Sequence, residues 1–135
     1  AYADADARAF GYAYGQVPQM PPKFEADEQL IQIAEKSASE LEGIRSARGL
    51  IASGDSFMSD PIRVQSVAEK FPGLQAVEME AAAIAQVAYQ YGLPFVVIRA
   101  LSDIAGKESD ISFDQFLNTA ALNSANLVLS MIKKL

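Results

Sequence analysis

Acidic residues stand at two points of the chain where carboxylates could take part in catalysis. Glu78 and Glu80 flank Met79 directly after a predicted strand, and Asp103 follows the apolar run at residues 95–98. Because ionised carboxylates only accept hydrogen bonds, the first pair suits a ligand with several hydroxyl donors, such as a ribose diol. A carboxyl group at the edge of an apolar core is partly shielded from water, which raises its pKa, so Asp103 could act as a general acid.

Structural roles are open for the same acidic residues. Glu78 and Glu80 lie at the start of a predicted helix, where the positive end of the helix dipole favours a carboxylate. Asp103 could instead pair with Arg99 or form a turn with Ser102. Spacing alone does not decide between these roles and a catalytic one.

A third segment, SGDSFM at residues 53–58, leaves another predicted strand. Gly54 allows a ligand to approach the backbone, and Phe57 could stack on a flat ring or belong to the core. Ligands of parallel sheets bind at the carboxyl ends of the strands, where this segment, residues 78–80 and residues 102–105 are all expected. Together these parts suit the cleavage of a glycosidic bond, which needs an acid for the leaving group and a second carboxylate that activates water or stabilises the cation.

The composition excludes several other kinds of chemistry. The 135 residues are 50% apolar and 21% charged, which describes one globular domain or a large piece of one. The chain has no Cys and no His, which excludes disulfides, thiolate or imidazole catalysis, and zinc sites with nitrogen or sulfur ligands. We expect no metal and no cofactor.

Charge and apolar runs indicate which partners to expect. The net charge of -6 repels the phosphates of nucleic acids and anionic lipid surfaces. No apolar run approaches the roughly 20 residues that span a bilayer. Asp4 and Asp6 lie where a signal peptide would be apolar. We expect no nucleic-acid partner, no membrane and a cytoplasmic location.

Strands and helices alternate along the predicted chain, which indicates an α/β architecture with an at least partly parallel sheet. A strand or extended arm is predicted at residues 1–14, a Pro-rich surface loop at 17–22, helices at 28–43, 61–71, 80–91 and 112–134, and strands at 48–52, 74–77 and 95–98. A capping box from Ser112 to Gln115 marks the start of the last helix. The predicted core face of that helix consists of Phe116, Leu117, Ala120, Ala121, Ala125, Val128, Leu129 and Ile132.

Several blocks of the sequence resemble those of one enzyme family. They are AFGYAYGQVP at residues 9–18, ARGLIASGDSF at 47–57, AVEMEAAAIA at 76–85 and PFVVIRALSDIA at 94–105. In this order and without obvious gaps, they resemble the bacterial 5'-methylthioadenosine/S-adenosylhomocysteine nucleosidases over all 135 residues. Several blocks together are far more specific than any one of them.

The resemblance implies a nucleoside phosphorylase-like three-layer α/β fold, in which helices flank a twisted mixed central sheet. It implies hydrolysis of the N-glycosidic bond of 5'-methylthioadenosine, S-adenosylhomocysteine and 5'-deoxyadenosine to adenine and the 5-substituted ribose, in methionine salvage and purine nucleoside catabolism. It also implies a homodimer in which the pocket for this small nucleoside is completed across the interface.

The same resemblance implies roles for individual residues. Asp103 would donate a proton to adenine N7, and Ser102 would orient the carboxyl group. Glu80 would bind the ribose hydroxyls, and Arg99 would support the carboxylates. The other residues implied in substrate binding are Phe57 against the adenine, Met58 through its backbone, Glu78 and Met79 on the sugar side, Phe113 beside the 5'-alkylthio group, Ala105, and Phe10 and Pro18 in the pocket of the neighbouring subunit.

Members of that family carry a further N-terminal segment, on the order of a hundred residues, which supplies the Glu taken to activate water. None of it matches this sequence, so residues 1–135 are expected to be the C-terminal portion of a single nucleosidase domain. Two alternatives remain open, namely a nucleoside phosphorylase, which uses phosphate as the acceptor, and a catalytically silent nucleoside-binding protein on the same scaffold. Asp103 favours adenine-type substrates, because phosphorylases for oxopurines resemble this site with Asn at that position.

Overall fold

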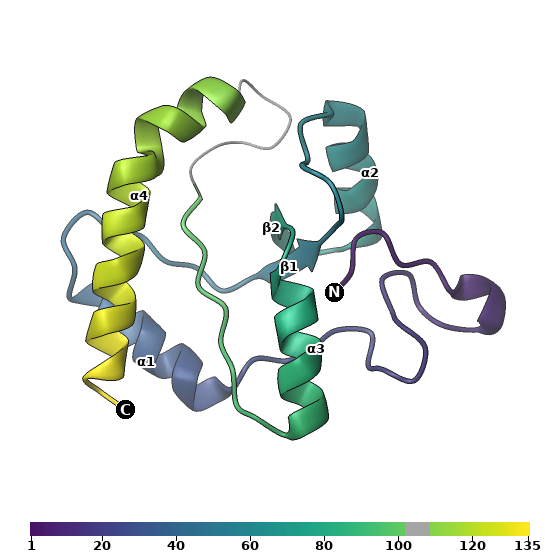
Figure 1. Cartoon of the computed structure of the whole chain (residues 1–135), viewed down its shortest axis with the longest axis horizontal. Coiled ribbons are helices and arrows are strands. Elements are labelled where there is room, and N and C mark those ends of the chain that lie inside the picture. The colour runs from purple at the N-terminus through teal and green to yellow at the C-terminus, as the bar shows by residue number, and fades with distance from the viewer. Residues whose placement is uncertain (102–108) are drawn as a thin grey trace. The chain divides into compact units, whose positions relative to one another are not determined.

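The structure, a computed structural model, describes the backbone of residues 1–101 and 109–135 and the side chains of residues 1–101 and 117–135. Its elements are, in order, η1 (Arg8–Phe10), α1 (Glu28–Ser39), β1 (Leu50–Ser53), α2 (Pro61–Lys70), β2 (Leu74–Glu78), α3 (Ala81–Tyr91) and α4 (Ser109–Ile132) (Figure 1). The described chain divides into two compact units, the first formed by Ala1–Glu25 and Gly49–Leu93, the second by Ala26–Arg48, residues 94–101 and residues 109–135. No helix within the described residues is long and apolar enough to cross a membrane.

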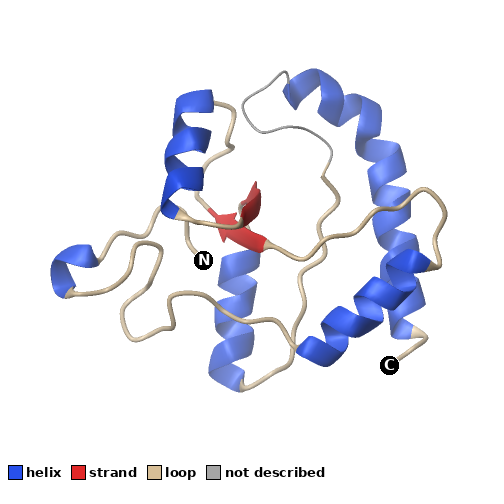
Figure 2. Cartoon of the chain, turned by 180° about the vertical axis from the view of Figure 1, so that it is seen from behind, coloured by secondary structure: helices blue, strands red, loops and turns tan. Residues whose placement is uncertain are grey.

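A parallel pair of strands forms the centre of the first unit. β1 and β2 pair with Ile51 opposite Ala76 and Ser53 opposite Glu78, and Figure 2 shows them as the red arrows. Tyr2 forms a parallel bridge with Ser53, so the first residues of the chain run along the other edge of β1. The predicted parallel arrangement of these two strands is confirmed.

Local signals set the two helices of the first unit. Asp60 caps α2 by accepting a hydrogen bond from the Ile62 N–H at 2.9 Å, and Pro61 occupies the first turn, where its missing N–H costs nothing. α3 ends at Tyr91, and the next residue, Gly92, has a φ of 63°, the left-handed conformation that glycine adopts without strain. The core against the sheet consists of Ala3, Ala52, Met58, Val67 and Phe71.

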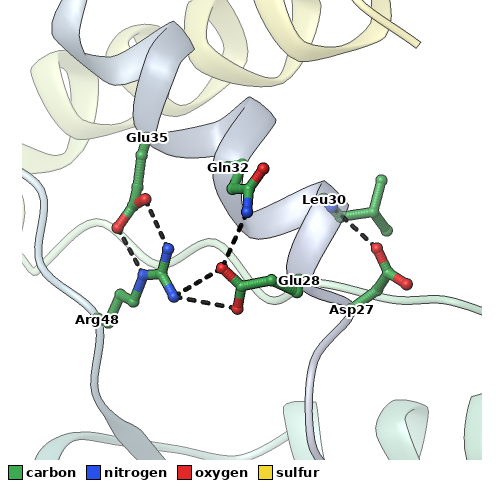
Figure 3. Close-up of polar contacts among 6 residues, drawn as sticks. All are labelled: Asp27, Glu28, Leu30, Gln32, Glu35 and Arg48. Carbon is green, nitrogen blue, oxygen red and sulfur yellow. Dashed lines mark hydrogen bonds and ion pairs between the residues drawn. The ribbon is translucent and has the colours of Figure 1, made fainter.

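Helices α1 and α4 form the second unit. Asp27 caps α1 through the Leu30 N–H at 3.0 Å, as its position before the apolar stripe predicts. On the exposed side of α1, Arg48 reaches Glu35 with its Nε at 2.6 Å and Glu28 with its Nη1 at 3.0 Å (Figure 3). The core between the two helices consists of Ala34, Ala38, Leu127 and Met131.

The predicted strand at residues 95–98 is wrong. This segment has no regular secondary structure, and its Phe95 carbonyl accepts a hydrogen bond from the Asp27 N–H at 2.8 Å. Val96 and Ile98 pack against the core of α1 and α4. The apolar run therefore reflects burial against helices, which a sequence pattern does not distinguish from burial within a sheet.

The ends of two helices also differ from the prediction. α1 ends at Ser39, before the predicted stop at Gly43, and the Ser39 hydroxyl donates to the Lys36 carbonyl at 2.8 Å. Such side-chain bonds compete with the helical ladder. Leu41 and Ile44 still pack against the core, which explains why helical spacing continues past the helix. α4 begins at Ser109, before the predicted capping box.

Among the side chains that the structure describes, the predicted core face of α4 is wrong as well; Phe116, also predicted for that face, lies outside them. Leu127 and Met131 are buried, at 8% and 7% exposure, whereas Leu129 and Ile132 are 56% and 58% exposed. Leu117 and Val128 are exposed too. Apolar residues lie on several faces of this helix, so their spacing does not select the one that meets α1.

Candidate active site

The loop that leaves β1 presents one aromatic ring and buries the side chain beside it. Phe57 is 58% exposed and lies outside the core of the first unit, so the alternative of a core role is wrong. Met58 is only 6% exposed and belongs to that core. Its side chain anchors the loop, which leaves its backbone as the part that a ligand could meet.

Glu78, at the end of β2, binds the start of α3. Its Oε2 accepts hydrogen bonds from the Glu80 N–H at 3.0 Å and the Ala81 N–H at 2.8 Å. These N–H groups belong to the N-cap residue and the first residue of α3, where they have no intrahelical acceptor and where a negative charge is favoured. The structural alternative of a helix-terminus partner therefore describes Glu78.

Ser53 connects the ends of the two strands. Its hydroxyl donates a hydrogen bond to Oε1 of Glu78 and accepts one from the Ala82 N–H at 2.8 Å. The Gly54 N–H donates to the Glu78 carbonyl at 2.9 Å. The loop after β1 and the turn before α3 are therefore one hydrogen-bonded assembly.

Met79 and Glu80 are exposed beside this assembly. Met79 is 47% exposed. Glu80 occupies the N-cap position of α3, yet its side chain makes no capping hydrogen bond. The two glutamates thus differ, because Glu78 completes the helix terminus while Glu80 presents its carboxylate at the surface.

Sequence reasoning missed two polar residues around the loop at 54–58. Asp4 and Arg63 both hydrogen-bond to the loop and to each other. The N–H of Asp55 donates to Asp4, and this bond, reinforced by Arg63, holds the pKa of the Asp4 carboxyl below its usual range. Asp4 lies here because the N-terminal segment pairs with β1 in this register. The sequence alone does not show that pairing, so it could not assign Asp4 to this loop.

Phe10 and Pro18 lie on surface turns of the first unit. Phe10 ends η1 and is 82% exposed. Pro18 is exposed in a turn closed by a hydrogen bond from the Met20 N–H to the Val17 carbonyl at 3.0 Å, with Gln19 at a φ of 66°. Pro at the second position and a positive φ at the third describe a type II turn.

The remaining predicted site residues belong to other parts of the chain. Arg99 is exposed in the second unit. Ser102, Asp103 and Ala105 lie outside the described residues, and the side chain of Phe113 in α4 does too. Among the residues that the structure describes, no group of three or more His, Cys, Asp or Glu could hold a metal ion.

Comparisons with known proteins place this arrangement in a family. A family model described as the phosphorylase superfamily matches residues 1–133. The chain belongs to the phosphorylase superfamily. Within this superfamily, it is 64% identical over 132 residues to the 5'-methylthioadenosine/S-adenosylhomocysteine nucleosidase of Anoxybacillus flavithermus, a match that covers 98% of this chain and 57% of that relative.

Solved structures show the same relationship. The nucleosidase of Neisseria meningitidis, in complex with methylthio-immucillin-A, matches with a TM-score of 0.95 and 51% identity over 100% of this chain and 58% of that one. The nucleosidase of Colwellia psychrerythraea, in complex with adenine, matches with a TM-score of 0.94 and 48% identity over 99% of this chain and 56% of that one. The nucleoside phosphorylase-like α/β fold that the resemblance implied is confirmed, and the chain spans a little over half the length of these relatives.

Proposed function

We propose that this chain is the base- and sugar-binding part of a nucleosidase that hydrolyses the N-glycosidic bond of 5'-methylthioadenosine, S-adenosylhomocysteine and 5'-deoxyadenosine. The observation that carries the proposal is the structural match, at a TM-score of 0.95, to a nucleosidase in complex with methylthio-immucillin-A. The exposed Phe57, Met79 and Glu80 support it, because they follow β1 and β2 at the edge where parallel sheets bind ligands.

The proposed reaction begins with the leaving group. Asp103 as a carboxylic acid donates its proton to adenine N7, so that adenine departs as a neutral molecule with the electron pair of the C1'–N9 bond. Ser102 orients the carboxyl group, and Phe57 stacks against the base. The resemblance to the family supports these roles, and the exposure of Phe57 leaves its ring available for such a contact.

Bond cleavage leaves a positive charge on the ribose, and a carboxylate beside the sugar stabilises this charge. Glu80 accepts hydrogen bonds from the ribose hydroxyls, and these bonds strengthen as the ring becomes cationic. Glu78 fixes the backbone of Glu80 through its Oε2. Met79 lines the sugar and Arg99 supports the carboxylates. Water then adds to C1' and loses a proton to the glutamate that the resemblance places in a further segment of the protein.

A homodimer is proposed as the working form. An aromatic side chain that is 82% exposed, as Phe10 is, suits insertion into a pocket of a second subunit. Pro18 lies on the neighbouring turn, which the Gln16 side chain holds through the Met20 carbonyl at 2.7 Å. Analytical ultracentrifugation of the protein and of Phe10→Ala tests this, and a wild-type monomer at assay concentration would contradict it.

The reaction is proposed to take place in the cytoplasm. The net charge of -6 supports this location, because it disfavours attachment to anionic membranes. Fractionation of the source cells with an activity assay tests it. Activity in the membrane or secreted fraction would contradict it.

Product analysis tests the reaction. The purified protein is incubated with 5'-methylthioadenosine in phosphate-free buffer and again with added phosphate, and adenine and the sugar product are quantified. Adenine with the free 5-methylthioribose in both buffers supports hydrolysis. Release that depends on phosphate and yields the sugar 1-phosphate would show a phosphorylase, and binding without release would show a silent nucleoside-binding protein.

A further inference from the structure

An ion pair between distant parts of the sequence holds the loop that carries Phe57. The N-terminal segment runs beside β1, where the Ala3 N–H donates to the Ser53 carbonyl at 2.6 Å. Ala3 is fully buried in the core of the first unit, so this register is fixed by packing as well as by hydrogen bonds. The next residue, Asp4, therefore lies beside the chain just as it leaves β1.

Both carboxylate oxygens of Asp4 are engaged there. Oδ2 accepts a hydrogen bond from the Asp55 N–H at 2.8 Å, and Oδ1 accepts one from Nη2 of Arg63 on α2 at 2.8 Å. Nη1 of the same guanidinium contacts the Ser56 hydroxyl. Asp4 and Arg63 thus bind two consecutive residues of the loop, and the next residue along is Phe57.

Gly54 makes the close approach possible. A Cβ added at this position would lie 2.7 Å from Oδ2 of Asp4, which is shorter than any ordinary contact. The chain therefore has a glycine where the carboxylate must meet the backbone. Asp4, Arg63 and Gly54 are referred to below as the loop clamp.

We propose that Asp4 and Arg63 are positioning residues that set the place of the Phe57 ring against the base of the substrate. The proposal rests on the proposed nucleosidase function. Asp4 fixes the Asp55 amide, and Arg63 links α2 to Ser56 and Asp4 through its planar guanidinium group. Without the clamp the loop samples several positions, and the stacking surface for a flat ring is no longer preformed.

Loss of the clamp should affect the binding of the base half of the ligand only. This distinguishes a positioning role from a general loss of protein stability, which would not be selective. Loss of the clamp weakens the binding of adenine, because adenine meets the loop. It leaves the binding of 5-methylthioribose nearly unchanged, because the groups proposed for the sugar follow β2, and the bonds of Ser53 and Gly54 that join that turn to the loop involve neither Asp4 nor Arg63. A merely destabilised protein would contain less folded enzyme, and the remaining folded molecules would bind both ligands normally.

The experiment compares Asp4→Asn, Arg63→Lys and Gly54→Ala with the wild-type protein. Inhibition of 5'-methylthioadenosine cleavage by adenine and by 5-methylthioribose gives the two affinities. We expect a roughly 5-fold weaker inhibition by adenine in Asp4→Asn, the size of losing part of a base–aromatic stack. KM should rise by a similar factor, while kcat and inhibition by 5-methylthioribose should change less than about 2-fold. Gly54→Ala should match Asp4→Asn, and Arg63→Lys should lie between them and the wild type.

Glu35→Gln is the matched control, because it also turns the carboxylate of an exposed acid–arginine pair into an amide (Figure 3). It belongs to the second unit and should leave both inhibition constants unchanged. Equal adenine affinity in Asp4→Asn and the wild type would overturn the proposal, as would equal losses for adenine and 5-methylthioribose.

Hydrogen exchange at the Asp55 amide separates this proposal from the proposed function. The amide should exchange faster in Asp4→Asn than in the wild-type protein, whatever reaction the protein catalyses. Slow exchange in both proteins would overturn the clamp itself. A wild-type protein that releases no adenine, with fast exchange in the variant, would instead overturn the nucleosidase function and leave the clamp in place.

Discussion

Replacement of Glu78 by Ala should lower stability, whereas replacement of Glu80 by Ala should mainly lower activity. Glu78 is half-buried and accepts two backbone N–H bonds of α3 together with one from Ser53. Loss of a capping acceptor costs about 1 kcal/mol, and hydrogen bonds to a charged group are worth about 1.5–3 kcal/mol each. Water can solvate the released N–H groups at this partly exposed site, so we expect a loss of about 2 kcal/mol.

Glu80 provides the comparison on the same turn. Its side chain is exposed and does not cap α3, and exposed polar contacts contribute about 0–1 kcal/mol. Thermal unfolding followed by circular dichroism measures the difference. At about 4 °C per kcal/mol for a chain of this size, Glu78→Ala should unfold about 8 °C below the wild-type protein, and Glu80→Ala within about 4 °C of it.

The assay on the same samples should give a different order. Glu80→Ala should be fully folded and yet lose most of its turnover of 5'-methylthioadenosine, because the carboxylate of Glu80 is proposed to stabilise the cationic sugar. Two results would refute this reasoning. One is a Glu78→Ala protein as stable as the wild type, and the other is a Glu80→Ala protein that loses as much stability as Glu78→Ala.

Two further predictions concern the pH dependence of Asp4 and the packing of α4. The folded-state pKa of Asp4 lies below its unfolded value, so its stabilising contribution is complete above the unfolded pKa of about 4 and is lost as the pH falls through the lower folded pKa. In urea unfolding, Asp4→Asn should therefore be less stable than the wild type at pH 7, and the gap should close below about pH 4; a gap of constant size would contradict this. On α4, Leu127→Ala should lower the free energy of unfolding by about 2–4 kcal/mol, because Leu127 is only 8% exposed. Leu129→Ala should lower it by less than about 1 kcal/mol, because Leu129 is 56% exposed. Chemical denaturation measures both values, and the reverse order would show that the predicted face was right.

Helix boundaries set by local chemistry could be predicted from the sequence. Asp27 and Asp60 cap the helices expected of them, and Gly92 has the left-handed backbone that ends α3. Each of these signals acts within one turn of chain. The two paired strands could be located as well, because short apolar runs before polar turns mark them, although the predicted ends at residues 52 and 77 each lie one residue before the observed ends at Ser53 and Glu78.

Features that depend on contacts between distant residues could not be predicted in the same way. Residues 95–98 are apolar at every position, which indicates burial but does not tell a strand from a segment packed on helices. The sequence also does not show that Glu78 hydrogen-bonds the start of α3 while Glu80 is exposed at its N-cap, because this depends on the geometry of the turn between β2 and α3. The role of Asp4 follows from the pairing of Tyr2 with Ser53 and the hydrogen bond from the Ala3 N–H to the Ser53 carbonyl, a register that no local pattern encodes.

Turnover of 5'-methylthioadenosine by Asp103→Asn tests most directly that this chain supplies the group that protonates the leaving base. Asp60→Asn is the control, because it makes the same exchange at an exposed N-cap where asparagine caps as well as aspartate. Adenine release in phosphate-free buffer should fall by at least about 100-fold in Asp103→Asn, the usual contribution of a general acid, and stay at the wild-type rate in Asp60→Asn. Near-normal release by a folded Asp103→Asn protein would contradict the proposed mechanism.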